Sequence, residues 1–162
     1  MTLKKFNKTE STVHKLVLPI ANDMNLSIWD IAFEKQGSEW FLTVLIDDNI
    51  DMNTCEELSR RISKMLDDTD PIPQSYMLEV GSAGLERDLL TEVHINAFVG
   101  KNVFVKLIRP MDGIKNGIKE LTAVLKNFDG EKCEFENENK NENNVIEIKN
   151  ISKIKSIMEE NK

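Results

Sequence analysis

The chain has 162 residues, of which 40% are hydrophobic, and its formal net charge at pH 7 is −7. This length and composition argue against a disordered tail and allow one compact domain or two small ones. The acidic balance argues against a protein that coats nucleic acid or membranes through bulk charge. No apolar run approaches the roughly 18 residues of a membrane span, so we expect a cytoplasmic protein without a targeting segment.

The charge is distributed unevenly along the chain. Through Glu92 there are 9 Lys and Arg residues against 17 Asp and Glu, a net charge of −8, and the remainder has 12 against 11, a net charge of +1. We therefore expect any phosphate-binding surface in the second part. The acidic first part is suited to docking a basic protein.

Periodic apolar patterns in residues 1–90 predict an α+β domain of two layers. The elements expected from helical or alternating spacing are a helix at residues 9–24, strands at 27–34 and 40–47, a helix at 53–66 and a strand at 76–80. The first helix is expected to continue past Pro19, and Asn53 and Glu56 are expected to form a capping box on the second.

This order of elements places both helices on one face of the sheet. The opposite face is then expected to be partly covered and to carry apolar side chains among polar ones. The apolar members expected there are Ile28, Phe41, Leu45 and Met77.

Residues 91–100 predict an ordered junction that contains a capped helical turn, and residues 101–162 predict a small β-barrel of the Sm-like or SH3-like kind. The strands expected from alternation lie at residues 103–107, 118–128, 133–135, 145–148 and 151–157. Asp129-Gly130 is a strong hairpin turn, and residues 136–144 are expected to form a hairpin tip. Closure into a barrel would remove exposed sheet edges.

Few residues suit catalysis. Neither histidine has a second metal ligand three or four positions away, and the two cysteines form no CxxC pair. The sequence GSAG at residues 81–84 is not a GxSxG nucleophile elbow, and it follows a strand instead of joining two helices as the GxxG loop of KH domains does. We expect no catalytic, cofactor or metal site. The catalytic alternative is a hydrolase built on Asp47, Asp48 and Ser82.

Several basic residues follow the junction, and they surround the loop at residues 109–113. The residues predicted to contact RNA are Lys106, Arg109 and Lys115. Each phosphate that such residues neutralise would steepen the salt dependence of binding by roughly 0.7 to 0.9 log units per log unit of salt. The alternative is that these side chains form a solvated barrel surface.

Residues 76–89, YMLEVGSAGLERDL, are here called the signature segment. They resemble the signature of the RimP family of bacterial ribosome maturation factors, which reads approximately Y-x-L-E-V-S-S-P-G-L-x-R-P-L. The matching residues are Leu78, Glu79, Val80, Ser82, Gly84, Leu85, Arg87 and Leu89. The sequences LID at 45–47, DPIP at 70–73 and FVG at 98–100 also stand in the family's order. Gly81, Ala83 and Asp88 depart from the signature, and the loss of two prolines is expected to loosen the loop.

The resemblance implies a noncatalytic assembly factor with an N-terminal α/β domain and a C-terminal Sm-like barrel. Such factors bind the immature small (30S) ribosomal subunit and assist its late assembly, so the implied partners are ribosomal RNA and a basic ribosomal protein of the decoding centre. We expect a monomer. The alternative is an Sm-like RNA-binding regulator that acts as a ring oligomer. We also expect Glu79 and Arg87 to pair and hold the loop across the sheet edge.

Overall fold

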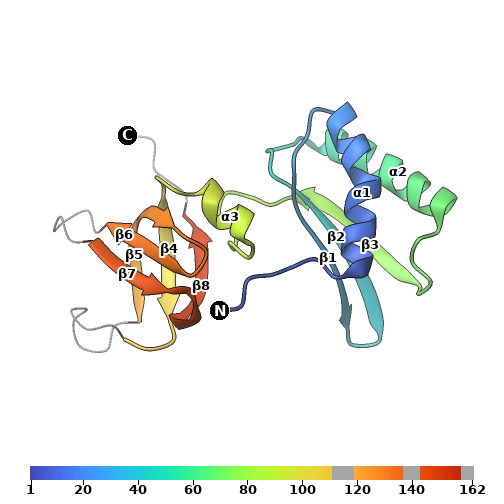
Figure 1. Ribbon diagram of the computed structural model, residues 1–162. Helices are drawn as coiled ribbons and strands as arrows, with labels where there is room; N and C mark the ends of the chain where they lie inside the picture. The colour runs from blue at the N-terminus through green and yellow to red at the C-terminus, as the bar shows by residue number, and fades with distance from the viewer. Residues whose placement is uncertain (111–118, 137–142, 158–162) are drawn as a thin grey trace. The chain divides into compact units, whose positions relative to one another are not determined.

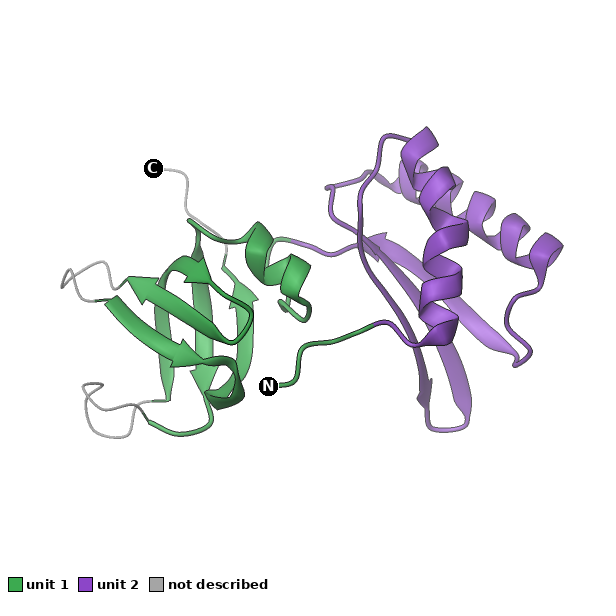
Figure 2. Ribbon diagram, in the orientation of Figure 1, with its two compact units in different colours: residues 1–5, 85–162 green, residues 6–84 purple. Residues whose placement is uncertain are grey.

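The computed structural model describes residues 1–110, 119–136 and 143–157. The chain forms two compact units, which Figure 2 shows in different colours. We call residues 6–84 the N-terminal unit, and residues 1–5 together with 85–162 the C-terminal unit. The division lies before the expected boundary at residue 90 because residues 85–89 bond to the last strand of the C-terminal unit. The helical turn expected in the junction is therefore part of that unit.

The N-terminal unit has the predicted order of helix, strand, strand, helix and strand (Figure 1). Its elements are α1 (Lys8–Asp23), β1 (Ile28–Gln36), β2 (Glu39–Ile46), α2 (Met52–Thr69) and β3 (Tyr76–Ser82). β1 and β2 form an antiparallel hairpin, and β3 pairs with β2 in parallel, so the sheet order is β1-β2-β3. Helix α2 supplies the crossover that two parallel neighbours require.

One apolar core lies between the sheet and both helices. Its buried members on these elements are Val13 and Val17 of α1, Leu58, Ile62 and Leu66 of α2, Ile31 and Phe33 of β1, and Leu42, Val44 and Ile46 of β2. The strand members lie two residues apart along each strand, so they project from a single face of the sheet. Both helices therefore cover that face, as predicted and as Figure 1 shows.

Helix α1 begins with a capping box that is also connected to the sheet. The Glu10 N–H donates to Oδ1 of Asn7 (2.8 Å), and the Asn7 N–H donates to Oε1 of Glu10 (3.0 Å). The second carboxylate oxygen of Glu10 accepts from the N–H of Phe33 in β1 (2.9 Å). Glu10 is only 4% exposed, so this carboxylate satisfies a buried backbone donor on an edge strand.

Helix α2 begins earlier than predicted. Asp51 is its N-cap and accepts from the N–H of Thr54 at 2.7 Å, and hydrogen bonds from Thr54 lower the pKa of the Asp51 carboxyl. The predicted capping box of Asn53 and Glu56 is therefore wrong. Asn53 lies inside the first turn, because the aspartate two residues before it provides a cap of equal quality.

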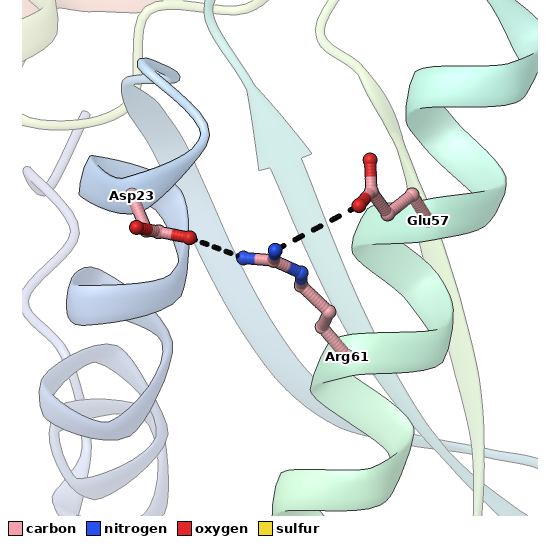
Figure 3. A network of polar contacts seen from close by, with 3 residues as sticks. All are labelled: Asp23, Glu57 and Arg61. Atoms are coloured by element: carbon pink, nitrogen blue, oxygen red, sulfur yellow. Dashed lines mark hydrogen bonds and ion pairs between the residues drawn. The ribbon is translucent and has the colours of Figure 1, made fainter.

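A guanidinium group connects the two helices on their exposed side. Arg61 of α2 lies 2.6 Å from the carboxylate of Asp23 in α1 and 3.7 Å from that of Glu57, one turn earlier in its own helix (Figure 3). All three side chains are exposed, so the network contributes little to stability.

A bulge in β1 changes which side chains lie on the open face of the sheet. Ile28 pairs with Ile46 and Asp30 pairs with Leu45, so Trp29 is an extra residue in β1. An extra residue inverts the alternation of side chains on one side of the bulge. Ile28 consequently packs against the core, and its predicted place on the opposite face is wrong.

The C-terminal unit contains a short helix and a five-stranded antiparallel sheet. Its elements are α3 (Glu92–Ala97), β4 (Asn102–Leu107), β5 (Glu120–Phe128), β6 (Lys132–Glu136), β7 (Asn143–Glu147), the 3₁₀ helix η2 (Ile148–Asn150) and β8 (Ile151–Ser156). The sheet order is β7-β6-β5-β4-β8. Within the described residues the outer strands β7 and β8 do not pair with each other. The structure thus shows a sheet, and a closed Sm-like or SH3-like barrel stays a prediction.

The short helix is capped as predicted. The His94 N–H donates to the hydroxyl of Thr91 (3.0 Å), and the buried ring of His94 accepts from the N–H of Leu90 through Nδ1 (3.1 Å).

Most of the predicted hairpin tip at residues 136–144 lies outside the described residues. None of the helices in the described ranges combines the length and the apolar character that a membrane crossing requires.

Candidate functional site

The first half of the signature segment forms β3 and its exit. Leu78 and Val80 pack against the core of the N-terminal unit, and Glu79 is exposed on the other face of the sheet. Beyond the strand, the hydroxyl of Ser82 accepts from the N–H of Gly84 (3.2 Å), and Gly84 has a φ of +82°. Glycine is favoured at such a φ because it has no Cβ. These signature residues build a strand and a turn.

The second half of the signature segment attaches to β8 of the C-terminal unit. The hydroxyl of Ser156 donates to the carbonyl of Leu85 (2.7 Å) and accepts from the N–H of Arg87 (2.9 Å). The Ser156 N–H donates to the Arg87 carbonyl (2.9 Å), and the N–H of Leu89 donates to the carbonyl of Ile154 (2.9 Å). The side chain of Leu89 is fully buried. The role of this half is therefore structural.

The residues of the predicted Glu79–Arg87 pair belong to different units. Glu79 belongs to the N-terminal unit and Arg87 to the C-terminal unit. Their pairing stays a prediction.

The three departures from the family signature are each accommodated. The N–H of Ala83 donates to the carbonyl of Ile46 (2.8 Å), a bond that proline cannot make. The carboxylate of Asp88 lies 3.4 Å from the ammonium group of Lys153. Gly81 has no atom within 4 Å of the place where a Cβ would stand, so a serine would also fit there. Bonds at two of the three positions offset the loosening expected from the missing prolines.

Restoring the family's prolines is expected to have unequal effects. Ala83→Pro removes the bond to Ile46, so the free energy of unfolding should fall by about 1 kcal/mol. Asp88→Pro should cost less, because the pairing of Asp88 with β8 uses backbone groups of the residues on either side of it. Urea unfolding of both variants tests this expectation. An Ala83→Pro protein more stable than the wild type would contradict it.

The residues predicted to contact RNA fall at different places. Arg109 follows β4 and lines a cavity of about 890 Å³. Lys106 lies within β4, is exposed, and is not among the residues that line the cavity. Lys115 lies outside the described residues. The structure thus separates two side chains that the sequence grouped.

The cavity at Arg109 is a basic groove, and we use this name for it below. Its cationic members are Arg109, Lys132 and Lys149, which come from the loop after β4, from the start of β6 and from η2. Glu147 also lines the groove, and its carboxylate lies 3.1 Å from the ammonium group of Lys149. Three cations against one carboxylate leave an excess of positive charge.

Two polar side chains hold the backbone that presents these cations. Oδ1 of Asn150 accepts from the Arg109 N–H (3.0 Å), and Nδ2 of Asn150 donates to the Arg109 carbonyl (3.3 Å). In the β5–β6 turn, one carboxylate oxygen of Asp129 accepts from the N–H groups of Glu131 (2.9 Å) and Lys132 (2.7 Å). These bonds lower the pKa of the Asp129 carboxyl. The backbone at Arg109 and Lys132 is therefore fixed, while the side chains of both residues remain accessible.

Lys106 belongs to a second basic surface, on the outer side of the sheet. It lies opposite Lys153 in β8, and the neighbouring pair is Phe104 with Lys155, whose ammonium group stands 5.4 Å from the ring centre of Phe104. Like charges directly opposite each other destabilise a sheet. The salt bridge from Lys153 to Asp88 relieves part of that repulsion.

Sequence reasoning missed Lys132 and Lys149 as groove residues. The register of β6 on β7 brings these two lysines together. In that register Lys132 stands opposite Glu147, whose carboxylate pairs with Lys149. Such a register links residues that are distant in sequence. The alternation within each strand does not reveal it.

Two residues of the catalytic alternative, Asp48 and Ser82, accept hydrogen bonds from backbone N–H groups. A carboxylate oxygen of Asp48 accepts from the N–H of Ser27 (2.9 Å), and the hydroxyl of Ser82 accepts from the N–H of Gly84. Both cysteines are free, and burial raises the pKa of the Cys133 thiol to about 12. In the part of the chain that the structure describes, no group of three or more His, Cys, Asp or Glu side chains could hold a metal ion.

The N-terminal unit resembles a domain of a known protein family. Residues 16–86 match the family model described as the RimP N-terminal domain. The chain carries the N-terminal domain of the RimP family. The match extends from the middle of α1 through β3 and into the signature segment, so the RimP resemblance is confirmed. RimP proteins are ribosome maturation factors, and the two-unit fold presents a RimP N-terminal domain together with a sheet-rich C-terminal unit.

Proposed function

We propose that this chain is a noncatalytic maturation factor that binds the immature small (30S) ribosomal subunit in the cytoplasm and assists its late assembly. The observation that carries the proposal is the RimP N-terminal domain at residues 16–86, followed by a unit with a basic groove. Phosphate oxygens of ribosomal RNA suit that groove, because Arg109 supplies a guanidinium fork and the two lysines supply mobile charges. Lys106 contributes a further RNA contact.

The charge of the two units supports two different partners. The N-terminal unit contains 6 Lys and Arg residues against 14 Asp and Glu, a net charge of −8. The C-terminal unit contains 15 against 14, a net charge of +1. An acidic unit is attracted to a basic protein and repels phosphates. On this ground the C-terminal unit contacts RNA and the N-terminal unit contacts a basic protein, for which the RimP resemblance implies a ribosomal protein of the decoding centre.

The mechanism follows from differential affinity. A factor that makes and breaks no covalent bond shifts an equilibrium only by as much as its affinities for the two states differ. The chain therefore binds the immature particle more tightly than the mature one, and it leaves as the particle matures.

The alternative of a ring-forming Sm-like regulator has one structural feature in its favour. The outer strands β7 and β8 are not paired with each other within the described residues, and pairing between copies could close a ring. The maturation-factor proposal expects a monomer, so sedimentation equilibrium of the purified chain separates the two. A hexamer or heptamer would favour the ring.

The proposed function is tested by sedimenting the chain with immature small subunits at low and at high salt. The expected result is that the chain sediments with the particles at low salt and is released as the salt rises, because phosphate contacts release counterions. A chain that stays in the supernatant at both salt concentrations would overturn the proposal.

A further inference from the structure

The sheet of the N-terminal unit has one face on which neither helix packs, which we call the open face. The strand registers place nine residues on it, in three rows across the sheet: Asp30, Leu45 and Gly81; Ala32, Thr43 and Glu79; Glu34, Phe41 and Met77. All of them except Asp30 are at least partly exposed, and Met77 is 55% exposed. The buried side chains of Val13 and Val17 in α1, and of Leu58, Ile62 and Leu66 in α2, contribute to the core on the opposite side.

The open face combines apolar side chains with carboxylates. Phe41 and Met77 are opposite each other on β2 and β3, and Leu45 lies farther along β2. Glu34 stands beside Phe41 on the β1 edge, and Glu79 lies on the β3 edge. The accessible carboxylates thus lie at the two edges, and Phe41 and Leu45 lie on the central strand between them. This arrangement is that of a protein interface, with an apolar centre and a polar rim.

The charge on this face selects the class of partner. None of its nine positions is occupied by Lys or Arg, and the whole unit has a net charge of −8. Nucleic acid and anionic lipid would be repelled. A second copy of this chain would bring the same carboxylates against these, which is destabilising. A positively charged protein segment is attracted, and its apolar side chains could cover Phe41 and Met77.

We propose that the open face is the docking surface for a lysine- and arginine-rich protein segment that also carries apolar side chains. The apolar side chains of the partner pack on Phe41, Leu45 and Met77, and its cations pair with Glu34 and Glu79. This assignment rests on the proposed function for the source of the partner, a basic protein of the small ribosomal subunit.

The test uses the full chain and two matched double variants. M77K/E79K changes the open face, whereas M52K/E56K changes the same two residue types on the solvent side of α2, where Met52 is 77% exposed. Both variants change the net charge by the same amount, so a general electrostatic effect appears equally in both. The probes are the purified ribosomal proteins of the small subunit, titrated one at a time, with circular dichroism to verify folding.

The expected result is that at least one basic ribosomal protein binds the wild type and M52K/E56K alike, and binds M77K/E79K at least tenfold more weakly. A milder variant, E34Q/E79Q, should lose several-fold in affinity and serves if M77K/E79K does not fold. The inference is overturned if none of these proteins binds the wild type, or if the open-face variants bind as tightly as the control. It is also overturned if M77K/E79K changes only self-association or RNA binding.

These outcomes differ from a failure of the proposed function. Sedimentation with immature subunits tests that function and includes the RNA contacts of the C-terminal unit. A chain that sediments with the subunits but shows no dependence on the open face would overturn the inference alone. A chain that does not sediment with them would overturn the proposed function.

Discussion

Replacing Arg109, Lys132 and Lys149 together by alanine is expected to lower the affinity of the chain for immature small subunits by roughly 100-fold or more at 0.1 M salt. If each cation contacts one phosphate, the three together contribute about 2 to 3 units to the slope of log affinity against log salt. The interval from 1 M to 0.1 M salt is one log unit, so losing this part of the slope lowers the affinity at 0.1 M salt by about 2 to 3 log units relative to the wild type. Affinity at low salt and its salt dependence should therefore fall together.

The control for this variant is K35A/R60A/K64A, which removes one arginine and two lysines from exposed positions of the N-terminal unit. It should retain both the affinity and the slope of the wild type. Lys106→Ala, measured separately, should reduce the slope by about one contact, roughly 0.7 to 0.9 units. If the slope of the triple groove variant equals that of the wild type, the basic groove does not bind RNA.

Glu10→Ala is expected to be the most damaging single substitution in the N-terminal unit outside its apolar core. The variant keeps the bond from the N–H of residue 10 to Asn7, but it loses the capping-box bond from the Asn7 N–H to Oε1 of Glu10 and leaves the N–H of Phe33 without its carboxylate acceptor in a buried setting. The lost capping-box hydrogen bond costs about 1 kcal/mol and a buried unsatisfied donor about 1 to 3 kcal/mol. The free energy of unfolding should therefore fall by about 2 to 4 kcal/mol.

Urea unfolding followed by tryptophan fluorescence measures this loss. Both tryptophans, Trp29 and Trp40, belong to the N-terminal unit, so the signal reports its unfolding. The control is Glu57→Ala, which removes an exposed carboxylate 3.7 Å from Arg61 and should change stability by less than about 0.5 kcal/mol. Equal stabilities of the two variants would contradict the role assigned to Glu10.

The apolar periodicity of the sequence was sufficient to predict the elements of the N-terminal unit. The stripe on α1 continues past Pro19, and the helix does the same. Periodicity did not reveal the bulge at Trp29, since an inserted residue leaves each flanking pattern intact and changes only the face to which it belongs. The cap of α2 was wrong because two short polar residues, Asp51 and Asn53, are both good caps and only the folded chain distinguishes them.

The candidate site was less predictable than the fold. The signature segment and its family were recognisable because their residues are contiguous, and the match at residues 16–86 confirms them. The basic groove brings Arg109, Lys132 and Lys149 together from three separate segments. Charge counting predicted phosphate binding in the second part of the chain, and the basic residues beside the loop at residues 109–113 led to the prediction of Arg109 as an RNA contact. The positions of Lys132 and Lys149 in the groove depend on how β6 pairs with β7, and no local sequence pattern encodes that register.

The most direct test of the central claim compares the affinity of the wild-type chain for immature and for mature small subunits at the same salt concentration. An assembly factor that works by binding alone must favour the state that it assists. Sedimentation titrations should therefore give at least tenfold tighter binding to the immature particle. Equal affinity for the two particles, or tighter binding to the mature one, would contradict the account.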